Sequence, residues 1–82
     1  MSRLIKRPLA NHALRADDCR RHPGVWIEIG SYRSNISARG ICNMIRKGLR
    51  TPYYLPAGSF EARTKLVDDG TVVYARYVGG AQ

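Results

Sequence analysis

The side chains best suited to bind a ligand in this sequence are cationic and amide groups that recur at helical spacing. Four of them follow at intervals of four, three and four residues, with Lys47 beside the third: Arg39, Asn43, Arg46 and Arg50. A helix projects this spacing from one face, and no acidic residue lies three or four positions from any of them. Such a stripe can contact a phosphate backbone or enter a major groove. A basic face that meets only solvent explains the same residues equally well.

A second candidate group lies near the C-terminus, where the sequence predicts a β-hairpin. Its outer face would carry Arg63, Lys65, Tyr74 and Arg76. Asp69-Gly70 favours a two-residue type I′ turn, which sets Arg63 directly opposite Arg76. Opposed like charges destabilise a sheet by up to about 1 kcal/mol, so we predict that an anion binds between the two arginines. Glu61, placed diagonally from Arg76, could instead relieve the repulsion, and a shift of register would remove the argument.

Tyrosines interleaved with these cations form a third candidate group. Tyr53 and Tyr54 follow Arg50 in a loop rich in proline. Aromatic rings beside arginines are suited to stacking on unpaired bases, although such residues more often pack over a small core or form a protein interface. Trp26 and Tyr77 are expected in the core.

Neither a metal site nor a catalytic site is predicted. The possible metal donors are His12, Cys19, His22 and Cys42. Their spacings match no zinc pattern, and Cys42 fits an apolar helix stripe better. Nothing places the two glutamates, Glu28 and Glu61, together, and no nucleophile or phosphate-binding loop motif is present. We therefore expect a protein without enzymatic activity, cofactor or bound metal.

Net charge is the most informative feature of the composition. Fourteen lysines and arginines against six acidic residues give a formal charge of +8. No acidic residue lies between Ile29 and Phe60, and the cations of that stretch are Arg33, Arg39, Arg46, Lys47 and Arg50. Solubility alone does not require such segregation, so the pattern favours an anionic partner. The sequence contains no apolar run long enough for a membrane span and no secretory signal, so we expect a cytoplasmic protein.

The expected fold is α+β, with the order (α)-β-α-β-β in a single domain over residues 9–79. The predicted segments are a basic tail at 1–8, a helix from Pro8 to before Pro23, a strand at 25–32, a helix at 34–50, a loop at 51–59, a hairpin at 60–78 and a frayed end at 80–82. The simplest arrangement is a small three-stranded antiparallel sheet with one or two helices packed on one face.

Apolar spacing predicts how the second helix meets the hairpin. Asn35 or Ser37 can cap its start, and Gly48 marks its end. The apolar stripe of the helix is Ala38, Ile41, Cys42 and Ile45. The facing residues of the hairpin are Phe60, Ala62, Leu66, Val73, Ala75 and Tyr77. We expect these two sets to form the core.

Five short motifs are spread along the chain from His22 onward: HPGVW at 22–26, YRS at 32–34, MIRKG at 44–48, PAGSFEA at 56–62 and VYARYVG at 73–79. On these motifs the chain resembles short basic proteins of actinobacteria and their phages that have no assigned activity. The resemblance implies a cytoplasmic protein encoded by a phage or mobile element, and it implies no site residues. The segment 41–58 is also similar to the helix-to-wing passage of excisionase-like DNA-binding proteins, although a strand replaces their first helix.

Taken together, these features predict a small, basic, non-enzymatic protein that binds nucleic acid, with DNA favoured over RNA. The helix stripe and the hairpin face would contact phosphates without reading a base sequence. The alternative is a protein-binding module, such as a phage-encoded inhibitor that docks on an acidic host protein. Exposed sheet edges are compatible with a homodimer, and no membrane partner is expected.

Overall fold

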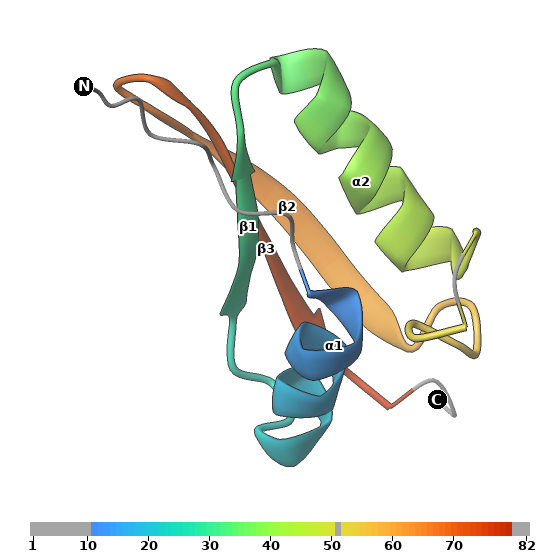
Figure 1. The fold of residues 1–82 in the computed structure, drawn as a ribbon. Helices are drawn as coiled ribbons and strands as arrows, with labels where there is room; N and C mark the ends of the chain where they lie inside the picture. The colour runs from blue at the N-terminus through green and yellow to red at the C-terminus, as the bar shows by residue number, and fades with distance from the viewer. Residues whose placement is uncertain (1–10, 51, 80–82) are drawn as a thin grey trace.

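The computed structural model describes residues 11–50 and 52–79 and contains two helices and a three-stranded antiparallel sheet. In chain order the elements are α1 (His12–Arg21), β1 (Ile27–Tyr32), α2 (Asn35–Lys47), β2 (Phe60–Val67) and β3 (Gly70–Tyr77). The strand order is β1-β3-β2, and both helices lie on one face of the sheet (Figure 1). The expected α+β fold is confirmed. The predicted tails at 1–8 and 80–82 lie outside the described residues.

Helix α1 packs on the sheet through two small side chains. The Asn11 side chain caps its start by accepting a hydrogen bond from the Leu14 N–H at 3.1 Å. Ala16 and Cys19 are buried, and the Cys19 thiol lies 3.6 Å from the Ala75 carbonyl oxygen of β3. The predicted start at Pro8 lies outside the described residues. The helix ends at Arg21, as expected from Pro23.

Helix α2 follows its predicted pattern closely. Ser34 caps its start, in place of Asn35 or Ser37, because its hydroxyl accepts from the N–H groups of Ile36 and Ser37. Gly48 ends it in the left-handed conformation, with φ 65°. The buried side chains of the helix are Ala38, Cys42, Met44 and Ile45. The opposite face is therefore free to carry the polar stripe.

A β-bulge changes which side chains of β1 face the core. Glu28 pairs with Tyr74, but Gly30 pairs with Val73, so one extra residue is inserted between them. Tyr32 consequently packs against the core, although strict alternation would place it on the same face as Trp26. Trp26 itself contacts arginines on the opposite face of the sheet. The expectation that Trp26 belongs to the core is therefore wrong.

The hairpin register differs by two residues from the predicted one. Val67 pairs with Gly70, so Asp68 and Asp69 form the turn. Type I′ geometry needs positive φ at both turn residues, and neither of these aspartates has it. A shift of two preserves the alternation of faces, so the predicted core residues Phe60, Ala62, Val73 and Ala75 are buried. Leu66, next to the turn, is 74% exposed.

The loop between α2 and β2 contributes the largest fully buried side chain, Tyr54. Its ring packs edge-on against His12 and against Phe60, with centroids 5.6 and 5.1 Å apart. Arg20 of α1 holds the loop by donating hydrogen bonds to two backbone carbonyl oxygens, those of Tyr53 at 2.7 Å and Leu55 at 3.0 Å. These contacts join α1, the loop and the sheet in one core.

Candidate functional site

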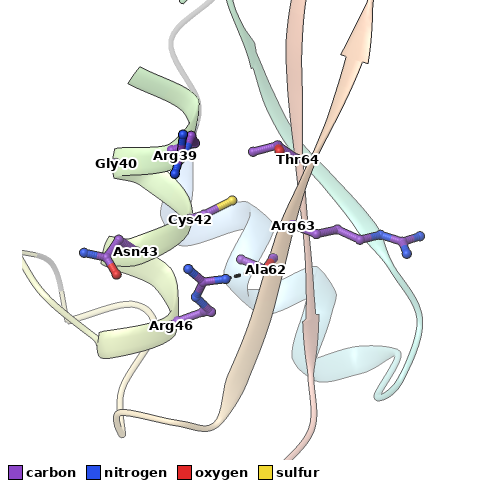
Figure 2. Close-up of a pocket in the computed structure, with 8 residues that line it drawn as sticks. All are labelled: Arg39, Gly40, Cys42, Asn43, Arg46, Ala62, Arg63 and Thr64. Atoms are coloured by element: carbon purple, nitrogen blue, oxygen red, sulfur yellow. Dashed lines mark hydrogen bonds between the residues drawn. The ribbon is translucent and has the colours of Figure 1, made fainter. Parts of the chain in front are cut away.

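A groove runs between the exposed face of α2 and the edge strand β2 (Figure 2). Its volume is about 620 Å³. The residues that line it are Arg39, Gly40, Cys42, Asn43, Arg46, Ala62, Arg63 and Thr64. The predicted stripe residues Arg39, Asn43 and Arg46 therefore do share one side of α2. Their spacing of four and three residues keeps them on one side of the helix, beside the groove.

Arg46 links the two walls of this groove. Its Nη1 atom lies 3.4 Å from the backbone carbonyl oxygen of Ala62, to which it donates a hydrogen bond (Figure 2). This carbonyl points away from β3, because the Val78 N–H donates to the Ser59 carbonyl and hydrogen-bonded pairs recur at every second residue, which leaves Ala62 and Ala75 as a pair without mutual hydrogen bonds. The hydrogen bond fixes the guanidinium beside the groove and leaves its positive charge uncompensated.

The cations over α2 and its flanks have no carboxylate partners in the described part of the chain. The exposed members of this group are Arg33, Arg39, Arg46, Lys47 and Arg50. By contrast, Arg15 and Arg21 of α1 lie 3.9 and 2.9 Å from the carboxylates of Asp18 and Asp17. Arg50 departs from the prediction, because it follows Gly48 with φ 68° and so lies outside the helix. We call the five cations Arg33, Arg39, Arg46, Lys47 and Arg50 the α2 basic surface.

The predicted anion site between Arg63 and Arg76 does not form. The actual register places Tyr74 opposite Arg63, and Glu61 opposite Arg76. Arg76 donates a hydrogen bond from Nε to Oε1 of Glu61 at 2.6 Å, and its Nη2 atom forms an ion pair with the same oxygen, also at 2.6 Å. An ion pair thus replaces the repulsive pair, and this exchange favours the observed register over the predicted one.

Both arginines instead stack on Trp26, on the sheet face turned away from the helices, which we call the outer face. The guanidinium carbons of Arg63 and Arg76 lie 4.3 and 4.6 Å from the centre of the Trp26 ring. The Arg63 side chain points away from α2 (Figure 2). Sequence reasoning missed this cluster because Trp26 was assigned to the core, although its alternation with the aliphatic residues of β1 already placed it on the outer face.

A second hollow lies beside this stack on the outer face. Its volume is about 460 Å³, and its lining residues are Trp26, Arg63, Thr64, Lys65 and Tyr74. The structure thus brings Arg63, Lys65 and Tyr74 together, as the sequence predicted, and adds the indole of Trp26. We call this site the Trp26 hollow.

The predicted tyrosine pair divides into one buried and one exposed residue. Tyr54 is 0% exposed and its hydroxyl lies 2.7 Å from Nδ1 of His12. Burial raises the pKa of its phenol, so the hydroxyl stays protonated. The prediction that Tyr54 stacks on bases is therefore wrong, because its ring is part of the core. Tyr53 is 40% exposed.

The possible metal donors are dispersed. Cys19 and Cys42 are buried thiols, and burial raises the pKa of Cys19 to about 11 and also raises that of Cys42. His12 is hydrogen-bonded to Tyr54, and His22 lies exposed after α1. Within residues 11–50 and 52–79, no three histidine, cysteine or acidic side chains are grouped to hold a metal ion. None of the described helices is long and apolar enough to cross a membrane.

The chain was compared with known protein families, curated proteins and solved structures. No protein-family model, curated protein or solved structure matches the chain. The functional inference therefore depends on the α2 basic surface, the groove beside it and the outer face of the sheet.

Proposed function

We propose that the protein binds nucleic acid, with DNA favoured over RNA, and that phosphates lie along the α2 basic surface. The observation that supports this is the unpaired state of its cations among the described residues. The chain does pair cations on α1, where Arg21 meets Asp17 at 2.9 Å. It leaves the same opportunity unused on α2, where acidic neighbours would each add a few tenths of a kcal/mol. An external polyanion would supply the missing partner.

The dimensions of α2 suit a phosphate backbone. Arg39 and Arg46 are seven residues apart, which is about 10 Å along a helix axis. Duplex DNA carries about six phosphate charges over that length. Asn43 lies between the two arginines and can donate a hydrogen bond to the same backbone. Such contacts supply affinity and orientation without a base code, so binding should be weakly selective and depend strongly on salt.

A salt titration with a labelled DNA duplex, followed by fluorescence anisotropy, tests this proposal. The logarithm of the binding constant should fall linearly with the logarithm of salt concentration. Arg39→Ala and Lys47→Ala should each flatten the slope by about 0.9, the value for one phosphate contact. Arg21→Ala is the matched control, because it removes an exposed arginine that is already paired with Asp17. Absence of binding at low salt would overturn the proposal, as would equal flattening by all three variants.

A second candidate function, protein binding, is favoured by the edge position of β2 beside the cationic groove. An extended acidic segment could add a strand to this edge and place its carboxylates against Arg39 and Arg46. The discriminating measurement compares an oligoglutamate peptide with an oligonucleotide of equal charge in the same anisotropy assay. Tighter binding of the peptide would favour the protein-binding function, whereas tighter binding of the oligonucleotide would favour nucleic acid.

A further inference from the structure

The outer face of the sheet carries a partly exposed arrangement that core packing does not explain, with Trp26 and Tyr74 half-buried and Arg63 exposed. In the described part of the chain both helices cover the opposite face, and Trp26 does not belong to the core cluster. Its ring instead lies against the guanidinium groups of Arg63 and Arg76. The result is a stack of flat groups, one aromatic and two cationic, at the surface of a rigid sheet.

Charge is distributed unevenly around this stack. Arg76 is compensated by Glu61 at 2.6 Å. Among the described residues, Arg63 and Lys65 form no ion pair, and both line the Trp26 hollow together with Tyr74. Two aromatic rings and two uncompensated cations therefore line this hollow, whose volume is about 460 Å³. This combination of flat rings and cations is what single-stranded nucleic acid requires.

We propose that the Trp26 hollow binds unpaired bases of single-stranded nucleic acid, with Arg63 and Lys65 contacting the adjoining phosphates. This inference rests on the proposed nucleic-acid function and adds the class of ligand and a second contact surface. A base can stack on the Tyr74 ring, on the Arg63 guanidinium or, after Arg63 swings away, on the indole. A duplex keeps the faces of its bases stacked inside, so it cannot use this platform.

The single tryptophan of the chain makes the site directly measurable. Because Trp26 is the only indole, its fluorescence reports on the hollow alone. We expect oligothymidylate to quench this fluorescence in a saturable manner, since a base placed against the stack changes the surroundings of the indole. A duplex of equal length should bind, as measured by anisotropy, with little change in Trp26 fluorescence.

Substitutions of the aromatic residues show how much of the affinity for oligothymidylate comes from base stacking and how much from charge. Tyr74→Ala and Trp26→Ala should weaken oligothymidylate binding about 5- to 100-fold, the loss expected for one stacked base. Trp26→Phe should restore most of the affinity, since it keeps an aromatic ring. The control is Leu14→Ala, which removes an exposed apolar side chain from α1, on the helix side of the sheet and outside both proposed binding surfaces. Circular dichroism and thermal unfolding confirm that each variant is folded.

The outcomes distinguish this inference from the proposed function. Binding by anisotropy without quenching of Trp26, together with equal affinities for Tyr74→Ala and Leu14→Ala, would overturn the inference and leave the charge-driven function intact. Absence of binding to both probes at low salt would overturn both. Quenching by oligothymidylate that Tyr74→Ala weakens and Leu14→Ala does not would establish the site.

Discussion

Arg63 and Arg76 stack on the same indole but differ in their availability to a ligand. Arg76 donates a hydrogen bond to Glu61 and forms an ion pair with it, whereas Arg63 faces Tyr74 across the strand pair. Glu61 therefore competes with any phosphate that approaches Arg76. Exposed ion pairs of this type contribute about 0–1 kcal/mol to stability, so the pair can open at little cost when a polyanion binds.

Replacing Glu61 should accordingly release Arg76 for binding. We expect Glu61→Gln to tighten oligothymidylate binding and to steepen the salt dependence by about 0.7, the value for one further phosphate on a single strand. The midpoint of thermal unfolding should change little. Asp68→Asn makes the same change in net charge at the hairpin turn and serves as the control in the same anisotropy titration. Equal tightening by both variants would show that net charge, and not Arg76, is responsible.

His12 makes the stability of the fold depend on pH. In the tautomer with Nδ1 unprotonated, Nδ1 accepts a hydrogen bond from the Tyr54 hydroxyl at 2.7 Å. Burial lowers the pKa of the imidazole from its ordinary value of 6.5, so the folded state favours the neutral ring. A positive charge at the start of α1 would also oppose the helix dipole. Stability is therefore full above pH 6.5 and is lost as the pH falls toward the lowered pKa of the folded state.

We expect the thermal unfolding midpoint to fall on acidification below pH 6.5. His12→Gln should reduce this dependence, because glutamine does not titrate and can still hydrogen-bond to Tyr54. The control is His22→Gln, which removes the exposed histidine after α1 and should leave the dependence unchanged. An unaltered pH profile in His12→Gln would show that His12 is not the group responsible.

At the level of elements, α2 positions the basic surface and depends on how the helix ends. Gly48 adopts φ 65°, and a Cβ there would lie 2.9 Å from a side-chain carbon of Leu55. Gly40 sits in the exposed middle of the same helix, where a Cβ would have open space, with no atom of a neighbouring element within 4 Å. The two glycines therefore have opposite roles, since only Gly48 needs the conformational freedom that glycine provides.

Alanine substitution should separate these roles. Gly48→Ala should lower the free energy of unfolding by about 1–2 kcal/mol, the cost of a left-handed conformation for a residue with a Cβ. Gly40→Ala should raise it by about 0.5–1 kcal/mol, because alanine favours the helix interior. Urea denaturation measures both. A stabilising Gly48→Ala would show that the helix does not end in the left-handed conformation.

The elements also show which parts of the fold could be predicted from the sequence. The burial of α2 and its end at Gly48 followed from apolar spacing and glycine chemistry, because both signals are local. The bulge in β1 has one local signal, Gly30, since a glycine inside a strand often marks a bulge; strict alternation ignores it and so misplaces Tyr32. The predicted hairpin register is wrong because a shift of two residues preserves both faces, so the apolar pattern cannot distinguish it from the observed register.

The candidate site also has parts that could be predicted from the sequence and parts that could not. The stripe of Arg39, Asn43 and Arg46 could be predicted because it lies on one helix. The stack on Trp26 could be predicted only in part, because alternation places Trp26, Arg63 and Arg76 on the outer face but their contact depends on how the strands pair. Tyr54 was misassigned because its partners, His12 and Phe60, come from other parts of the chain and no local pattern reveals their contact.

At the scale of the whole molecule, the uneven distribution of charge affects both the stability of the fold and the binding of a polyanion. The net charge is +8, and the α2 basic surface has no carboxylate partner among the described residues. In the free protein these positive charges therefore repel one another, and the compact fold holds them close together. A bound polyanion would remove this repulsion and would also stabilise the folded state by mass action.

Salt should consequently affect the free and the bound protein in opposite directions. Raising salt from about 0.01 M to about 0.15 M shortens the screening length from about 30 Å to about 8 Å, so the unfolding midpoint of the free protein should rise. With saturating oligonucleotide the midpoint should fall over the same range, because salt releases the polyanion. Calorimetric scans at matched pH measure both trends, and Lys47→Gln should weaken each. A midpoint of the free protein that falls with salt would contradict the prediction, since the ion pairs of α1 and the hairpin would then outweigh the repulsion around α2.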